Sequence, residues 1–126
     1  MALSQIALGF ARDIQHLGPL DGATHYGVAG VPGDGPYFQL WLIVRDGQIL
    51  RVSYKTPGCP SSRAVGGGLS QLIQGRVLNA ALTLNAKDLR AVIGALPEGK
   101  DVNFTLAAEA LSNVRPVEME RATDGN

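Results

Sequence analysis

Two strand-like runs joined by the dipeptide Asp46-Gly47 are the feature that most restricts how this chain can fold. The runs cover residues 37–44 and 48–56, and both are rich in aromatic and branched side chains, which are typical of β-strands. Asp-Gly tolerates the positive φ that a two-residue turn requires, so the sequence predicts a tight antiparallel hairpin. In the second run apolar residues alternate with polar ones, which predicts one buried and one wetter face. The residues predicted to share the buried face are Leu50, Val52 and Tyr54.

Helical periodicity appears on both sides of the hairpin. Four segments carry apolar residues three and four apart, the spacing of one helix face: residues 3–17, 60–75, 86–96 and 104–114. Ser4, Asn85 and Asn103 are of the residue types that cap helix N-termini, and Pro60 suits a first helical position. A loop rich in Gly and Pro, residues 20–36, is expected to hold a short strand around residues 24–29.

These elements predict an α+β fold in which a small antiparallel sheet of about three strands is packed on one face by several helices. The chain has 126 residues and is 45% hydrophobic, which suits a single domain over residues 1–126. We expect the core to cover about residues 4–114. The polar segment 115–126 is expected to be a frayed tail.

Charge and composition exclude several classes of protein. Eleven Lys and Arg residues balance eleven Asp and Glu residues without any basic block, so the sequence predicts no binding to nucleic acid or to anionic membranes. The longest apolar stretch, residues 40–44, is too short to span a bilayer. One cysteine cannot form an internal disulfide, and the N-terminus lacks the pattern of a secretion signal, which together predict a cytoplasmic protein. No nucleophile with a base and an orienting group can be recognised, so we expect no independent enzyme.

The single cysteine, Cys59, lies between the second predicted strand and the following helix. A helix start presents unpaired backbone N–H groups and the positive end of the helix dipole, and both stabilise a thiolate. Lys55 and Arg63 add positive charge nearby. The alternative is a small buried residue that fills a gap, as many free cysteines do. The residues alone leave both interpretations open.

Three consecutive glycines, Gly66-Gly67-Gly68, fall inside the predicted helix after Cys59. Each costs about 1 kcal/mol relative to alanine in a helix interior, so the triplet indicates close packing or a local break. A phosphate-binding loop is a weaker alternative, because no G-x-x-x-x-G-K-[ST] pattern surrounds these residues.

Several short motifs follow one another in a specific order over residues 4–114. They are Asp46-Gly47-Gln48-Ile49, Gly58-Cys59, Gly75-Arg76, Asp88-Leu89, Leu96-Pro97-Glu98-Gly99-Lys100 and the segment Leu106 to Leu111. In this order and spacing the chain resembles the NifU/IscU-type iron–sulfur cluster assembly scaffolds. An Asn-Pro-Arg-Asn motif of that family is replaced here by Asp13-Ile14-Gln15-His16.

The resemblance implies a site of three cysteines assisted by an aspartate, with a histidine before the last cysteine. Cys59 matches the middle cysteine, and Asp34 matches the aspartate. The first cysteine position falls on Pro32, and the final His-Cys pair falls on Val102 and Asn103. The site is therefore expected to be degenerate, with Cys59 and Asp34 as its remaining cofactor-binding and metal-binding residues.

The chemistry of the remaining ligands limits the cofactor. Iron–sulfur clusters are normally held by four thiolates or a close variant, so one thiolate and one carboxylate argue against cluster building on one chain. An iron–sulfur cluster or iron is implied by the resemblance. A zinc site made of Cys59, Asp34 and His25 is an alternative, and a fully degenerate site would hold no cofactor.

Three functions remain open from the sequence. The first is a scaffold-like protein of iron–sulfur assembly, in which a homodimer shares a cluster between two Cys59 thiolates. The second is an acceptor that takes persulfide sulfur from a cysteine desulfurase-type partner, with Asp34 as a proton acceptor. The third is a non-catalytic protein-binding module that kept the fold. The resemblance also implies a chaperone partner that recognises the segment from Leu96 to Lys100.

Overall fold

The structure, a computed structural model, describes residues 3–117. In chain order its elements are α1 (Gln5–Ala11), β1 (His25–Val31), β2 (Asp34–Arg45), β3 (Gln48–Lys55), α2 (Pro60–Ile73), α3 (Leu78–Ala81), α4 (Ala86–Ile93), α5 (Val102–Ser112) and β4 (Arg115–Pro116). None of these helices is long and apolar enough to cross a bilayer within the part of the chain that is described.

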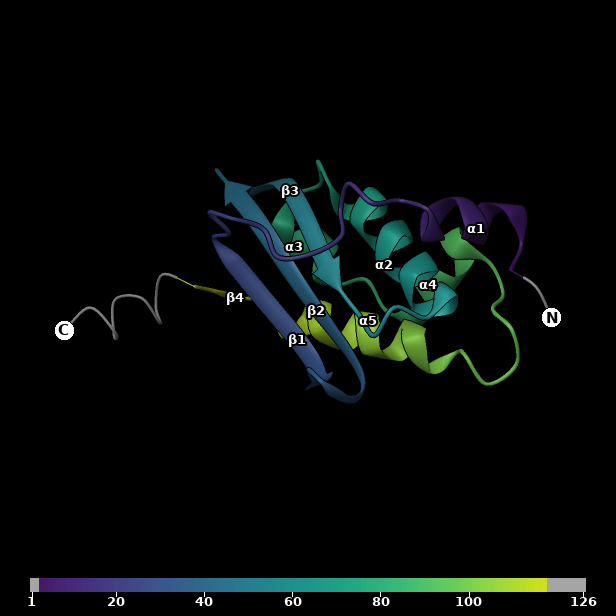
Figure 1. The fold of residues 1–126 in the computed structure, drawn as a ribbon. Helices are drawn as coiled ribbons and strands as arrows, with labels where there is room; N and C mark the ends of the chain where they lie inside the picture. The colour runs from purple at the N-terminus through teal and green to yellow at the C-terminus, as the bar shows by residue number, and fades with distance from the viewer. Residues whose placement is uncertain (1–2, 118–126) are drawn as a thin grey trace.

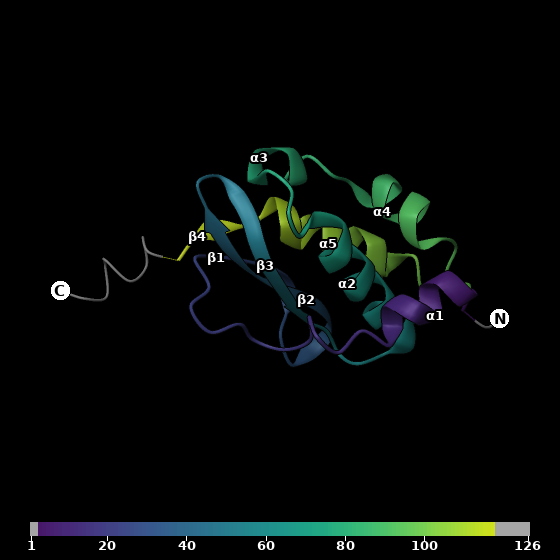
Figure 2. The same cartoon turned by 90° about the horizontal axis from the view of Figure 1, so that it is seen from above.

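The strands form one antiparallel sheet in the order β3-β2-β1-β4. The helices gather on one face of this sheet (Figure 1), and the view from above shows the same two layers (Figure 2). The α+β fold predicted from the sequence is confirmed, with four strands instead of about three. The fourth strand, β4, lies where the sequence predicted the start of the frayed tail, and residues 118–126 of that tail lie outside the described residues.

The hairpin between β2 and β3 turns at the predicted dipeptide. Asp46 has a φ of 53° and Gly47 a φ of 77°, as a two-residue turn of this kind requires. The register shifts by one residue between Ile43 and Val44, where a β-bulge interrupts the pairing. The bulge resets the alternation, so that Ile49 is fully buried whereas Leu50 is 41% exposed. The prediction of Leu50 on the buried face is therefore wrong.

Helix α2 lies at the centre of the helical layer and packs against α1, α4, α5 and β3. Its three glycines allow these contacts, and all three are buried. A Cβ atom added at Gly66 would overlap the ring of Tyr54, one at Gly67 the carbonyl oxygen of Phe10, and one at Gly68 the side chain of Ile93. Of the three interpretations of the triplet, close packing is therefore the correct one.

The N-terminal helix is shorter than predicted, because it ends at Ala11 and not near residue 17. Ser4 caps its start as predicted, accepting a hydrogen bond from the N–H of Ala7. After the helix, the side chain of Asp13 accepts hydrogen bonds from the backbone N–H groups of Gln15 (2.9 Å) and His16 (3.3 Å). A side-chain acceptor of this kind offers the backbone an alternative to further helix.

Asp13 also joins this segment to α2. Its carboxylate accepts hydrogen bonds from His16 Nδ1 at 2.7 Å and from Gln71 Nε2 at 2.8 Å, and only 8% of its side chain is exposed. Burial by itself raises the pKa of Asp13, but the hydrogen bonds from Gln71 and His16 outweigh burial and hold the pKa below its ordinary value of 3.8. The ionised carboxylate therefore stabilises the folded chain.

Replacing Asp13 with asparagine is expected to lower the free energy of unfolding by about 1–2 kcal/mol at neutral pH. Because the folded pKa is depressed, this contribution is complete above pH 3.8 and is lost as the pH falls through the folded value. Denaturant unfolding of both proteins between pH 7 and pH 3 measures the difference. The exposed Asp21→Asn variant is the control, and a gap between native and Asp13→Asn that is unchanged at low pH would contradict the assignment.

The outer edge of β3 is covered at both ends by other segments. Near its end, Tyr54 donates its N–H to the carbonyl of His16, and Gly18 donates its N–H to the carbonyl of Tyr54. Near its start, Ile49 exchanges hydrogen bonds with residues 75–76, and a bridge joins Gln48 to Val77. Short pieces of chain thus act as partial fifth strands along this edge.

Candidate functional site

A cavity of about 660 Å³ lies beside Cys59, where three distant segments of the chain meet. These segments are the turn between β1 and β2, the loop that leads into α2, and the approach to α5. The lining residues are Gly33, Gly35, Pro36, Tyr37, Pro57, Cys59, Ser62, Gly99, Lys100, Val102 and Asn103. The fold therefore gathers one thiol, one ammonium group and several small or apolar residues around a single space.

Cys59 is the residue at the N-cap of α2, and its half-buried thiol makes no capping hydrogen bond. Burial by itself raises the pKa of the thiol. The nearby backbone N–H groups of Ser62 and Ser61, together with the positive charge of Lys100, outweigh burial and hold the pKa of Cys59 below its ordinary value of 9.0. The interpretation of Cys59 as an activated thiol is thus the one that the geometry favours.

The loop that carries Cys59 is fixed by hydroxyl groups. Thr56 and Ser62, both buried, hydrogen-bond to each other at 3.0 Å, and the Ser62 hydroxyl donates to the carbonyl of Cys59 at 2.8 Å. Gly58, with a φ of 95°, makes the turn just before the thiol. These contacts hold the start of α2 so that its free N–H groups lie beside the sulfur.

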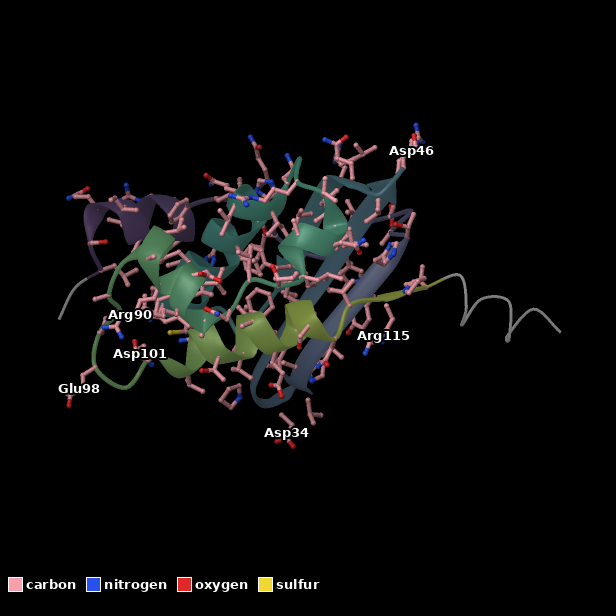
Figure 3. All side chains as sticks on the ribbon, turned by 180° about the vertical axis from the view of Figure 1, so that it is seen from behind. Asp34, Asp46, Arg90, Glu98, Asp101 and Arg115 are labelled. Carbon is pink, nitrogen blue, oxygen red and sulfur yellow. The ribbon has the colours of Figure 1, made fainter. Side chains whose placement is uncertain are left out.

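Lys100 is held near Cys59 by the start of α5. Arg90 of α4 pairs with Asp101 at 3.6 Å, and Figure 3 shows the two side chains facing one another beside the segment that carries Glu98. This pair is exposed, so we expect it to orient the segment more than to stabilise it. From the sequence, Lys100 was predicted only as part of a partner-binding motif. Its place three residues before the last family ligand position was the signal that it lies at the site.

Two of the three cysteine positions of the family line the same cavity, and the third, Pro32, is next to a residue that does. Gly33, next to Pro32, lines it, and so do Cys59 and Asn103. Val102, at the family's histidine position, is a further lining residue. Two family ligand positions thus meet at this cavity, and only one of them, Cys59, carries a thiol.

Asp34 is not among the residues that line the cavity, although its neighbours Gly33 and Gly35 are. It is exposed, and Figure 3 shows it at the tip of the β1–β2 turn, pointing away from the body of the molecule. In this conformation, Cys59 lines the cavity without the carboxylate that the resemblance assigns to the site.

His25 begins β1, whereas the β1–β2 turn follows the other end of that strand, about 20 Å away along the chain. The His25 ring pairs with the Thr24 hydroxyl at 2.9 Å. The structure thus does not bring His25 to Cys59 and Asp34. Residues 3–117 contain no group of three or more His, Cys, Asp and Glu side chains that could hold a metal ion.

Asn103 does not cap the last helix as predicted. The N-cap of α5 is Asp101, and Asn103 lies in the first turn, where its side-chain amide donates to the carbonyl of Lys100 at 2.9 Å. The helix begins at Val102, two residues earlier than predicted. From this position in the first turn, Asn103 lines the cavity.

Comparison with known proteins extends these observations. Residues 4–115 match the model of the NifU-like N-terminal domain family. This chain belongs to the NifU-like N-terminal domain family. The resemblance read from the sequence motifs is therefore confirmed.

Relatives in this family include proteins named for iron–sulfur assembly. The scaffold protein IscU of Aquifex aeolicus is 32% identical over 99 residues, which cover 77% of this chain and 63% of that protein. The bifunctional protein NifU/MnmA of Rubrobacter xylanophilus is 32% identical over 108 residues, which cover 79% of this chain and 22% of that protein. The chain thus spans less than two thirds of the length of these relatives.

Solved structures share the fold. A candidate scaffold protein of the SUF iron–sulfur system from Fervidobacterium islandicum superposes with a TM-score of 0.64 at 18% identity, covering 86% of this chain and 93% of that one. The N-terminal part of a NifU-like protein from Brucella abortus has a TM-score of 0.53, also at 18% identity, and covers 86% of this chain and 77% of that one. At this identity the similarity shows the fold alone.

The residues of this NifU-like domain do not fit an iron–sulfur cluster held by one chain. The cavity offers one thiolate, while Gly33, Val102 and Asn103 provide none of the soft ligands that clusters require. An exposed Asp34 that points into solvent does not complete the set.

Proposed function

We propose that this NifU-like protein acts in iron–sulfur cluster assembly as a sulfur acceptor, with Cys59 as its only reacting residue. The observation that carries the proposal is a solvent-accessible thiol of lowered pKa, set at a helix start in a cavity that also holds Lys100. This chemistry needs one activated thiol and no further ligand. The protein then carries sulfur and does not turn over a substrate of its own.

The transfer step is balanced without an added oxidant. The Cys59 thiolate attacks the outer sulfur of a persulfide on a donor protein of the cysteine desulfurase type. A new sulfur–sulfur bond forms at Cys59, the bond to the donor cysteine breaks, and the donor leaves as a thiolate. A lowered pKa increases the fraction of Cys59 that is ready to attack at neutral pH.

A cluster shared between two chains is the second candidate function. The meeting of Cys59 and Asn103 at one cavity, with Gly33 next to Pro32 also on its wall, favours it, because a cluster bound there would lie beside Cys59. Two copies of the chain would supply two thiolates across a two-fold axis. The scaffold role would then depend on a homodimer.

The partner segment from Leu96 to Lys100 supports docking of a second protein near the site. Leu96 is buried, whereas Glu98, Gly99 and Lys100 are exposed, and the last two also line the cavity. A chaperone bound to this segment would cover one wall of the cavity beside Cys59. The donor protein would need the same opening, so the two partners would compete.

Sulfur acceptance is tested with purified protein, a small-molecule persulfide donor and mass spectrometry of the intact chain. We expect the native protein to gain the mass of one sulfur atom and the Cys59→Ser variant to gain none. Anaerobic iron and sulfide analysis of the same samples separates the two candidates. Stoichiometric iron and sulfide lost in Cys59→Ser would favour the shared cluster, and a native protein that takes up neither sulfur nor iron would leave only a binding module.

A further inference from the structure

A second cavity, of about 340 Å³, lies next to the loop that carries Cys59. Alternate residues of this loop line the two spaces: Pro57 and Cys59 line the first, and Thr56 and Gly58 line the second. The loop is thus a shared wall between them. None of the functions proposed above uses the second cavity.

Positive charge distinguishes this second cavity. Lys55, from the end of β3, and Arg63, from the first turns of α2, both line it, and no carboxylate does. Two ion pairs are formed within residues 3–117, His16 with Asp13 and Arg90 with Asp101, and neither involves the two cations of the cavity. Two like charges that line one small space without a counter-charge favour the binding of an anion.

Arg63 carries a second sign of an incomplete site. Its Nε atom is buried and has no hydrogen-bond partner. A covered donor without an acceptor is unfavourable, and most such groups in folded proteins are satisfied. The guanidinium would gain from an acceptor that entered the cavity and drew the side chain toward it.

The neighbours of Arg63 leave its Nε atom without an acceptor, although the guanidinium contacts the hydroxyl oxygen of Tyr54. The hydroxyl of Tyr54 lies beside Arg63 and donates to its carbonyl oxygen at 3.2 Å. Burial raises the pKa of Tyr54, so this phenol stays neutral at neutral pH and offers Arg63 no negative charge. Asp13 is close enough to influence Tyr54, but its carboxylate is bound by His16 and Gln71 and is not part of the cavity wall.

The rest of the wall is apolar or backbone. Leu17 and Pro19 provide carbon surface, and Gly18 and Gly58 provide close-lying main chain. We propose that this cavity binds an oxyanion, a carboxylate or phosphate on a short apolar stem, with Lys55 and Arg63 holding the charge and Leu17 and Pro19 contacting the stem. An acidic side chain of a docking protein and a free small anion share this chemistry.

The test is a titration of the isotope-labelled protein followed by NMR at constant ionic strength. The probes are inorganic phosphate and a glutamate residue blocked at both ends, with sodium chloride as the reference salt. We expect saturable shifts of the Arg63 Nε–H signal and of the Gly18 and Gly58 amides. If only phosphate gives saturable shifts, the ligand of the cavity is a free phosphate. If the blocked glutamate gives saturable shifts, the ligand is an acidic side chain.

Charge-removing variants make the result specific. Lys55→Gln and Arg63→Gln are each expected to weaken binding roughly tenfold or more, since each removes a charge-assisted hydrogen bond. Arg51→Gln, which removes an exposed charge from the same strand outside the cavity, is the matched control and should bind as the native protein does. Lys55 is exposed, so its variant tests the proposal even if Arg63→Gln unfolds. Shifts that do not saturate, that chloride reproduces, or that all three variants retain would overturn the proposal.

Discussion

Replacing Gly67 with alanine is expected to lower the free energy of unfolding by about 2 kcal/mol or more. A Cβ atom at this position would overlap the carbonyl oxygen of Phe10 in α1. That oxygen belongs to the backbone, so the clash cannot be relieved by rotating a side chain, and α1 must move away from α2. The loss outweighs the gain of up to about 1 kcal/mol that alanine normally brings to a helix interior.

Denaturant unfolding of the purified variant measures this effect. Gly9→Ala is the matched control, because Gly9 lies in α1 itself and its added Cβ would meet nothing within 4 Å. We expect that variant to be as stable as the native protein or more stable, by up to about 1 kcal/mol. Equal stability of the Gly67 and Gly9 variants would show that the two helices are not in close contact.

Returning cysteines to the two empty ligand positions is expected to create a cluster-binding protein. The double variant Pro32→Cys, Asn103→Cys is expected to place two further thiols at the cavity of Cys59, because Asn103 lines it and Pro32 directly precedes Gly33, which also lines it. Three thiolates approach the ligand set that iron–sulfur clusters need. After anaerobic reconstitution we expect stoichiometric iron and sulfide with the charge-transfer absorbance of a cluster, well above the native protein.

Two controls test whether the iron and sulfide bound by the double variant depend on these three positions. Removing the native thiol by Cys59→Ser in the double variant should abolish the bound cluster. Two cysteines at exposed positions outside the cavity, Gln48→Cys and Ser112→Cys, add the same number of thiols and should bind no more iron than the native chain. If the exposed pair binds as much, the iron is adventitious and the three positions do not form a site.

Turns and helix caps could be predicted from the sequence, because they depend on residues that are close together in the chain. The Asp46-Gly47 turn is confirmed, and so is the cap at Asn85, which forms a capping box with Asp88. Leu50 was placed on the wrong face because a bulge depends on the pairing of two strands, and strict alternation within one strand does not reveal it. The first helix was predicted too long for a similar reason, since the side chain of Asp13 ends the helical pattern by contacts outside α1.

In the candidate site, too, local features could be predicted and contacts between distant segments could not. The place of Cys59 at a helix start could be predicted because the loop, the helix-start residues and the motif around it all lie within a few residues. Lys100 and the rest of the cavity wall could not be derived from spacing alone, because β1–β2 and α5 meet Cys59 only in the folded sheet. Asp34 follows the family motif in sequence, yet as the first residue of β2, beside the tip of a hairpin, it is free to point into solvent.

The covered edge of β3 has a consequence for how this protein behaves at high concentration. Exposed strand edges are templates on which a second molecule can add its own strand, and apolar strands such as β2 and β3 make that reaction favourable. Here residues 16–18 and 75–77 already occupy hydrogen-bonding positions at both ends of the edge. A cleavage or mutation that released either segment would therefore make the chain prone to aggregate through its sheet.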